Sequence, residues 1–195
     1  MTDKTRNELL DELVALGFPS GVFEGLRALT IQSYTEANSK SGVQHEGSTL
    51  LTAVAGLSSN DTIFLTGALP VALKGRIINF DGVGVKGEIY TGATYTGGTP
   101  VEYQNASDIN RVAGLAQIIV GATVTNDGDL AFAPTYSFGN ESNQGKGGIQ
   151  STLGGEKLLK PNTAYLLRLT SLDAQAQNIS SFLTWYEGEL DLPLP

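Results

Sequence analysis

Residues 163–170 read Thr-Ala-Tyr-Leu-Leu-Arg-Leu-Thr, and residues 179–187 read Ile-Ser-Ser-Phe-Leu-Thr-Trp-Tyr-Glu. In both stretches the bulky side chains alternate with a period of two, which is the period of a β-strand and not of a helix. Both faces of each stretch carry large groups, as the neighbours Trp185 and Tyr186 illustrate. We therefore predict two strands, each covered on one side by a second sheet and on the other, in part, by a neighbouring chain.

The period of two continues upstream as far as Leu29, with turn residues such as Asp81-Gly82 between the candidate strands. The sequence Asn126-Asp127-Gly128 predicts a tight hairpin, because Asp-Gly readily adopts the positive φ that such turns need. The glycine-rich segment 137–156 has no period, and we expect a loop that is functional, mobile or ordered by a partner. The expected strands are 29–35, 49–56, 62–66, 71–80, 84–91, 115–125, 129–133, 163–171 and 179–188.

This number of short strands, joined in places by long connections, predicts a mainly β chain. Residues 29–195 are expected to form a jelly-roll-like or Greek-key β-sandwich.

Residues 1–28 show a different pattern, and we expect an N-terminal helical arm there. Thr5-Arg6-Asn7-Glu8 has the form of a capping box, and a leucine stripe at helical spacing follows over residues 6–16. Gly17 and Pro19 would end this helix, and Ser20 would cap a second short helical turn. A short helix does not stay ordered alone in water, so its apolar face packs either on the chain's own β domain or on a partner.

The composition narrows the possible functions. Charged residues make up 16% of the 195, and the net charge is −8. A chain with that charge and scattered basic residues is a poor binder of nucleic acid or of an anionic membrane. The absence of cysteine excludes disulfides, thiolate metal sites and cysteine nucleophiles, and it favours synthesis in a cytoplasm.

Few residues have the context that catalysis or cofactor binding would need. Residues 82–87 match G-x-G-x-x-G, but a strand-like segment follows where dinucleotide binding needs a helix, so we expect a glycine-kinked strand. His45 is the sole histidine, and we expect it to form hydrogen bonds at a strand end or an interface. Glu187 and Glu189 could serve a glycosidase, but acids that flank a terminal strand are usually solvated. We therefore expect no enzyme, no cofactor and no metal site.

Several runs, taken in order, carry a resemblance to a known class of protein. They are Tyr95-Thr96-Gly97-Gly98-Thr99, residues 105–111, residues 124–132, the glycine-rich loop, the run Leu-Lys-Pro-Asn-Thr-Ala-Tyr-Leu-Leu-Arg-Leu-Thr at 159–170, and Phe-Leu-Thr-Trp-Tyr-Glu at 182–187. Over residues 85–188 the chain resembles β-rich structural proteins from the virions of tailed bacteriophages, which are similar to head decoration or cement proteins. The resemblance implies a jelly-roll-like fold, homotrimers, attachment to the major capsid protein and a location in the virion. It does not extend to the N-terminal helix.

The expected function is therefore binding to other protein surfaces, either copies of the chain itself or the major capsid protein and other virion proteins. Arg168 would pair with a carboxylate across an interface or, as an edge-strand charge, oppose aggregation. The candidate partner interface consists of Leu9, Leu10, Leu13, Val14, Phe18, Arg168, Trp185 and Tyr186.

The alternative is a tail- or fibre-associated module that binds host surface glycans. Aromatic side chains are the platforms on which sugars stack. The candidate platforms are Tyr90, Tyr95, Tyr103, Tyr136 and Trp185.

Overall fold

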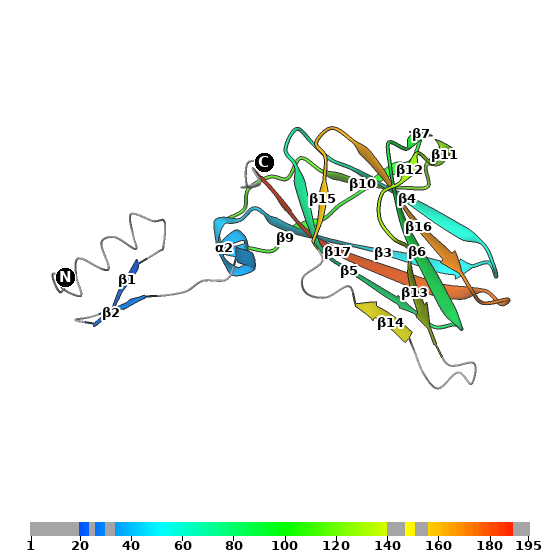
Figure 1. Ribbon diagram of the computed structural model, residues 1–195, viewed down its shortest axis with the longest axis horizontal. Helices are drawn as coiled ribbons and strands as arrows, with labels where there is room; N and C mark the ends of the chain where they lie inside the picture. Colours follow the sequence, from blue (N-terminus) through cyan, green and yellow to red (C-terminus); the bar gives the residue numbers. More distant parts are fainter. Residues whose placement is uncertain (1–19, 24–25, 30–33, 140–146, 151–155, 189–195) are drawn as a thin grey trace, which may run out of the picture.

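A computed structural model describes residues 20–23, 26–29, 34–139, 147–150 and 156–188 (Figure 1). In this part of the chain the fold is mainly β, as the sequence predicts, and every strand pairing is antiparallel. The helix expected over residues 6–16 lies outside the described residues.

The helix of the described part is α2 (Tyr34–Ser41). The strands of the first half are β1 (Ser20–Phe23), β2 (Leu26–Leu29), β3 (Gln44–Val54), β4 (Ser59–Leu65), β5 (Val71–Phe80), β6 (Gly84–Thr91) and β7 (Thr94–Thr96). Those of the second half are β8 (Thr99–Val101), β9 (Gln104–Asn105), β10 (Gln117–Val120), β11 (Thr123–Asn126), β12 (Asp129–Leu130), β13 (Thr135–Phe138), β14 (Gly147–Gln150), β15 (Lys157–Leu159), β16 (Ala164–Ser171) and β17 (Gln177–Glu187).

Two larger sheets make up most of the structure (Figure 1). The first has the strand order β12-β6-β16-β4-β10-β8, with β13 also paired to β6. The second has the order β14-β5-β17-β3-β9, with β15 also paired to β5. The pairs β1–β2 and β7–β11 form two separate two-stranded sheets.

The two stretches that first indicated a β fold are inner strands of the two sheets. β16 pairs with β4 on one side and β6 on the other, and β17 pairs with β3 and β5. An inner strand has both edges hydrogen-bonded, so its faces decide how the sheets pack. On β16 the side chains of Tyr165, Leu167 and Leu169 are all buried.

The two larger sheets pack face to face around a shared core. One buried cluster joins Phe64 and Leu167 of the first sheet to Leu73 and Trp185 of the second. The Trp185 ring meets the Phe64 ring edge to face, with centroids 5.3 Å apart. A second cluster joins Val85 and Leu169 of the first sheet to Ile78, Phe80 and Ile179 of the second.

The sequence suggested that a neighbouring chain covers part of this strand pair. On the outer face of β16, the chain itself provides the cover around Leu166. Leu166 is fully buried there in a third cluster with Ile63, Ala93 and Ile119. Tyr95 of β7 and Val124 of β11 pack against this cluster. The small β7–β11 pair therefore covers that part of the first sheet.

Strands 71–80 and 84–91 are confirmed at both ends. The strand expected over 115–125 is wrong, because Gly121, with φ of 67°, breaks it into β10 and β11, which belong to different sheets. The hairpin expected at Asn126-Asp127-Gly128 is also wrong. Gly128 does have a positive φ of 78°, but β11 pairs with β7 whereas β12 pairs with β6. The turn therefore carries the chain from one sheet to another.

The expectations for the described residues before Gln44 need correction too. Residues 20–23 and 26–29 pair as strands, with Ser20 opposite Leu29, in place of the second helical turn. Cross-strand pairing here overrides the helical propensity of the segment Leu26–Leu29. The strand expected over 29–35 ends at Leu29, and α2 begins at Tyr34. The boundary drawn between residues 28 and 29 therefore falls inside a strand.

Short strands lie at the edges of both larger sheets, but β9 covers only His45 and Glu46 of the longer β3. Among the described residues, the first sheet ends on β8 at one side and on β12 and β13 at the other, with lengths of 3, 2 and 4 residues. The second ends on β9 at one side and on β14 and β15 at the other, with lengths of 2, 4 and 3 residues. β14 falls within 137–156, so that segment is not a simple loop.

Candidate functional site

The segment between β9 and β10, residues 106–116, has no regular secondary structure and is held in place by polar contacts on its inner side. The Asn105 side chain donates to the carbonyl oxygens of Gly42 at 2.5 Å and Val112 at 3.1 Å. The Val112 amide donates to the Gly42 oxygen at 3.1 Å, and the Asn110 side chain donates to the Ser41 oxygen at 3.1 Å. These bonds attach the 106–116 loop to the turn that follows α2.

Gly42 allows this close approach. Its φ is 75°, and a Cβ added there would collide with the carbonyl oxygen of Asn110. A side chain at this position would therefore push the 106–116 loop away from the turn.

The outer side of the 106–116 loop carries three exposed apolar side chains, beside the exposed ion pair of Asp108 and Arg111. The exposed fractions of Ile109, Val112 and Leu115 are 100%, 46% and 50%. Beside it lies a hollow of about 420 Å³, bounded by β8, by the segment that leads to β9 and by residues 114–117. Pro100, Val101 and Leu115 contribute apolar surface to the hollow. Ordered apolar side chains next to a hollow are typical of a surface that binds another protein.

A buried carboxylate anchors the end of the loop. Glu187, at the end of β17, is 5% exposed. Its oxygens accept hydrogen bonds from the amides of Leu115 at 2.6 Å and Ala116 at 3.2 Å. They also accept one from Nε1 of Trp185 at 2.9 Å. The carboxylate is thus occupied by three N–H donors, which makes it a structural group and a poor candidate for a catalytic base.

His45, on β3, lies next to the carboxylate of Glu187. It is buried, its ring centroid is 5.7 Å from that of Trp185, and its Nε2 is 4.0 Å from Oε1 of Glu187. Burial lowers the pKa of His45 below its usual value, and the charge of Glu187 opposes this shift to a lesser extent. His45 is the second residue of β3, which agrees with the strand end that the sequence predicts, and its side chain lies in the core near Tyr103. Burial, with a smaller effect of Glu187, raises the pKa of Tyr103 to about 12.

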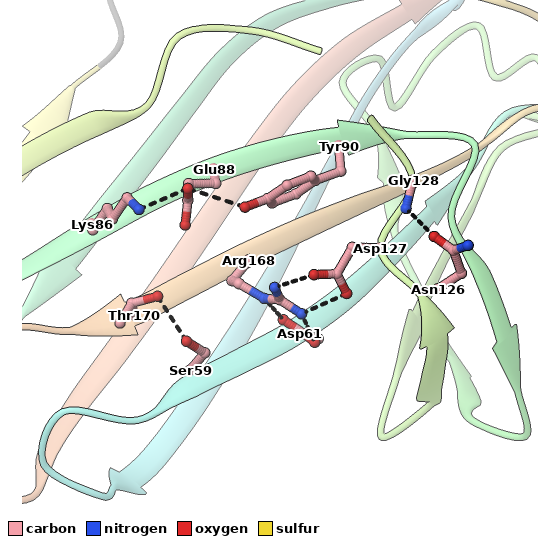
Figure 2. A network of polar contacts seen from close by, with 10 residues as sticks. All are labelled: Ser59, Asp61, Lys86, Glu88, Tyr90, Asn126, Asp127, Gly128, Arg168 and Thr170. Atoms are coloured by element: carbon pink, nitrogen blue, oxygen red, sulfur yellow. Dashed lines mark hydrogen bonds and ion pairs between the residues drawn. The ribbon is translucent and has the colours of Figure 1, made fainter. Parts of the chain in front are cut away.

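Arg168 forms the centre of a separate polar network on the outer face of the first sheet (Figure 2). Its Nε and Nη2 donate to the two carboxylate oxygens of Asp61 at 2.8 and 2.9 Å. Its Nη1 and Nη2 donate to those of Asp127 at 2.6 and 3.0 Å. These bonds raise the pKa of the Arg168 guanidinium. The guanidinium thus ties β16 to β4 and to the turn before β12.

A second group on the same face lies on β6 (Figure 2). Oε1 of Glu88 accepts from Nζ of Lys86 at 2.7 Å and from the hydroxyl of Tyr90 at 3.1 Å. The Tyr90 ring lies 5.6 Å from the Arg168 guanidinium, close enough for a cation–π contact. The three acids that pair with Arg168 and Lys86 belong to this chain, so these two cations do not need a partner for neutralisation.

The structure separates the residues that the sequence grouped as a partner interface. Trp185 is fully buried in the core, so it cannot present a surface to a partner or a sugar, and that expectation is wrong. Arg168 pairs with carboxylates of its own chain and not across an interface. Tyr186 is half-buried on the opposite face of β17 from Trp185. The other five candidates, Leu9, Leu10, Leu13, Val14 and Phe18, lie outside the described residues.

Sequence reasoning missed Ile109, Val112 and Leu115 as a surface, because the first two lie in a long connection and the third was expected to begin the strand 115–125. The available signal was three bulky apolar residues in a stretch that is otherwise polar and aperiodic. The G-x-G-x-x-G match lies on a bend and on β6, which confirms the expected strand there. None of the helices in the described ranges is long and apolar enough to cross a membrane.

No family model and no curated protein matches the chain. Among solved structures, the chain is weakly similar to the tripod from the baseplate of bacteriophage Tuc2009. The identity is 12%, the match covers 88% of this chain and 95% of that one, and the TM-score is 0.13. It is also weakly similar to the VP2 protein of infectious bursal disease virus, at 12% identity over 86% of this chain and 44% of VP2, with a TM-score of 0.11. Both of these neighbours are structural proteins of viruses, but scores this low carry no argument about fold or function.

Proposed function

We propose that the chain is a non-enzymatic structural protein of a virion that acts by binding protein surfaces, most specifically as a homotrimeric capsid decoration or cement protein on the major capsid protein. The observation that carries this proposal is the 106–116 loop. It is held by hydrogen bonds on one side and presents Ile109, Val112 and Leu115 on the other. The sequence resemblance over residues 85–188 supplies the virion context.

Order in the free state makes this loop suitable for binding. A flexible loop would lose conformational entropy when it docked, which weakens association. The 106–116 loop is already anchored to α2, to β9 and to Glu187, so little of that cost remains. Burial of an exposed Leu or Ile side chain contributes about 1.5–3 kcal/mol, so a few such contacts support a stable interface.

The strand order supports a jelly-roll assignment for the two larger sheets. The second sheet brings β3, β17, β5 and the β14/β15 edge side by side. The first brings β4, β16, β6 and the β12/β13 edge side by side. The chain therefore alternates between the sheets along β3 to β6, and returns through β16 and β17 to lie between its own first strands. That path is the one expected for the double Greek key of jelly rolls, which recur in viral capsid domains, and it therefore supports the proposed assignment.

The glycan alternative is weakened by the burial of Trp185, its largest aromatic platform. Tyr136 remains exposed and could still contact a sugar. We therefore keep glycan binding as an outcome of the test and not as a second proposal.

The test is binding of the purified protein to capsids that lack it. Ile109→Asp and Leu115→Asp should each weaken binding about 10- to 150-fold, because each replaces about 1.5–3 kcal/mol of apolar burial with a carboxylate that must be desolvated. Leu50→Asp is the matched control, since the exposed fraction of Leu50, 67%, lies between those of Leu115 and Ile109 but Leu50 lies on β3. Light scattering on a size-exclusion column should give three times 20.5 kDa for the free protein.

If the wild-type protein does not bind such capsids but binds glycans on an array, the proposal is overturned in favour of the glycan-binding module. Equal binding by wild type and Leu115→Asp would leave a virion role possible but would remove the 106–116 loop as its surface.

A further inference from the structure

A polar layer divides the core between the two larger sheets. The first buried cluster contains Leu73 of β5 and Leu183 of β17, and the second contains Ile78 and Ile179 of the same strands. Between them, β5 contributes Arg76 and β17 contributes Ser181, both buried. On the first sheet the corresponding positions are Gly87 of β6 and, opposite it, Thr135 of β13. Four neighbouring strands thus place a cation, two hydroxyl groups and a glycine at one level of an otherwise apolar interior.

Arg76 is the unusual member of this layer. Its exposed fraction is 8%, and its Nε donates one long hydrogen bond, 3.4 Å, to Oγ of Ser181. Among the residues that the structure describes, no carboxylate lies within ion-pair distance of the guanidinium. Burial lowers its pKa to about 10, so the group still carries its charge at neutral pH. A charge buried without a partner costs several kcal/mol, so folded proteins generally supply a counter-ion.

Arg168 and Arg76 differ in how their charges are neutralised. Arg168 is more exposed, yet two aspartates neutralise it with four hydrogen bonds. Arg76 is more deeply buried and has the single bond to Ser181.

The guanidinium of Arg76 lines a pocket of about 50 Å³ between the sheets. Gly87 lies beside it: a Cβ there would be 3.7 Å from Nη1, an ordinary contact, but only 2.9 Å from Oγ1 of Thr135, which is a clash. A second cation, Lys157 of β15, also lines the pocket, with its Nζ 5.1 Å from the centroid of the Phe132 ring. The remaining lining is largely apolar and includes Leu73, Ile78, Ile89 and Ala133.

We propose that this pocket binds a carboxylate group, held by the guanidinium of Arg76 with Lys157 as the second cation. A carboxylate matches the planar fork of a guanidinium with two parallel hydrogen bonds, which spherical anions cannot do. The volume exceeds the roughly 10–15 Å³ that one water needs on the same measure, so a carboxylate with a short aliphatic stem fits. This inference does not depend on the proposed function.

Such a group has two possible sources. One is a free small carboxylic acid, and the other is the side chain of an Asp or Glu that another protein, including a second copy of this chain, inserts into the pocket. Both present the same chemistry to Arg76, so the experiment must separate them.

The test measures the melting temperature of the purified full chain at pH 7 and constant ionic strength, with formate, acetate or N-acetyl-aspartate amide from 0 to about 100 mM, a range that spans affinities typical of very small ligands. Acetamide, which has the shape of acetate but no charge, is the matched ligand control. Carboxylates should raise the melting temperature in a saturable manner, by roughly 5–10 °C at one hundred times Kd, whereas acetamide should not.

Variants then locate the effect. Arg76→Gln should abolish the carboxylate-dependent rise, and Arg76→Lys should weaken it because an ammonium lacks the planar fork. Arg111→Gln, which removes an exposed guanidinium paired with Asp108, should leave the rise unchanged. If Arg76→Gln does not fold, the comparison of acetate with acetamide on the wild type still decides.

The probes also separate the two sources. A response to formate and acetate alone indicates a free small acid, and a response that includes N-acetyl-aspartate amide indicates that a protein side chain fits. The proposal is overturned if no carboxylate gives a saturable rise, if acetamide matches acetate, or if Arg76→Gln responds as the wild type does.

Discussion

Replacement of Glu187 by Gln is expected to destabilise the protein and to loosen the 106–116 loop. The wild-type carboxylate accepts from the amides of Leu115 and Ala116 and from the indole of Trp185. A Gln keeps one accepting oxygen and turns the other into an NH₂ group that faces an N–H donor. The substitution is nearly isosteric, so packing around β17 should change little.

The magnitude follows from these three donors. A hydrogen bond to a charged group contributes about 1.5–3 kcal/mol, against about 0.5–1.5 kcal/mol for a neutral one, so loss of the charge removes roughly 1 kcal/mol at each donor. One donor left without an acceptor costs a further 1–3 kcal/mol or so. Relief of the cost of burying a carboxylate offsets part of this sum. We expect a net loss of about 2–4 kcal/mol in the free energy of unfolding, which lowers the melting temperature by roughly 5–15 °C.

Urea denaturation at pH 7 measures the loss, and amide hydrogen exchange at Leu115 and Ala116 reports on the loop. Glu102→Gln is the control, because Glu102 is an exposed acid at the same hollow. Trp185→Phe removes one of the three donors, so the double variant with Glu187→Gln should lose less than the sum of the two single variants. If Glu187→Gln and Glu102→Gln both lose less than about 0.5 kcal/mol, as surface substitutions do, then Glu187 does not anchor the loop.

Three further outcomes are expected. Folding lowers the pKa of His45, so its contribution to stability is complete above the pKa of the unfolded state, near 6.5, and is lost as the pH falls below that pKa. In urea titrations, the wild type should therefore lose more stability than His45→Gln between pH 7 and pH 5. Arg168→Met should cost about 2 kcal/mol in low salt, and the loss should shrink in 1 M NaCl, because the side chain is partly exposed. Gly128→Ala should lower the melting temperature clearly more than Gly97→Ala: both glycines have positive φ, which costs roughly 1–2 kcal/mol for Ala, but a Cβ at Gly97 meets open space whereas one at Gly128 collides with Thr91.

The sequence predicts the long strands well because their signal is local. β5 and β6 were expected at their observed bounds, since alternating apolar side chains flank a clear Asp81-Gly82 turn. The strands β7, β8 and β9 were missed, since segments of 3, 3 and 2 residues are too short to show a period. Pairing partners depend on contacts distant in sequence, so the local sequence does not show that Asn126-Asp127-Gly128 connects two different sheets.

The same limit applies to the sites. Glu187 was expected in solvent because an acid at a strand end usually is, and only the long-range folding of the 106–116 loop over it makes it buried. Lys74-Gly75-Arg76 interrupts the apolar run of β5, but the sequence does not show that Arg76 is buried or that its hydrogen-bond partner is Ser181 of another strand. Trp185 was assigned to a surface from the size of both faces of β17, although size alone does not tell which face meets the other sheet.

The short strands at the sheet edges limit how copies of this protein can associate. An unpaired edge extends only as far as it offers a continuous row of N–H and C=O groups, and the edge strands seen here offer 2 to 4 residues at a time, except where β3 continues beyond the two residues that β9 covers. At β8 the row is further interrupted by Pro100, which has no N–H to donate. Among the described residues, strand-by-strand pairing between copies would thus be confined to the part of β3 from Gly47 to Val54. At the other edges, contacts through side chains would be favoured instead.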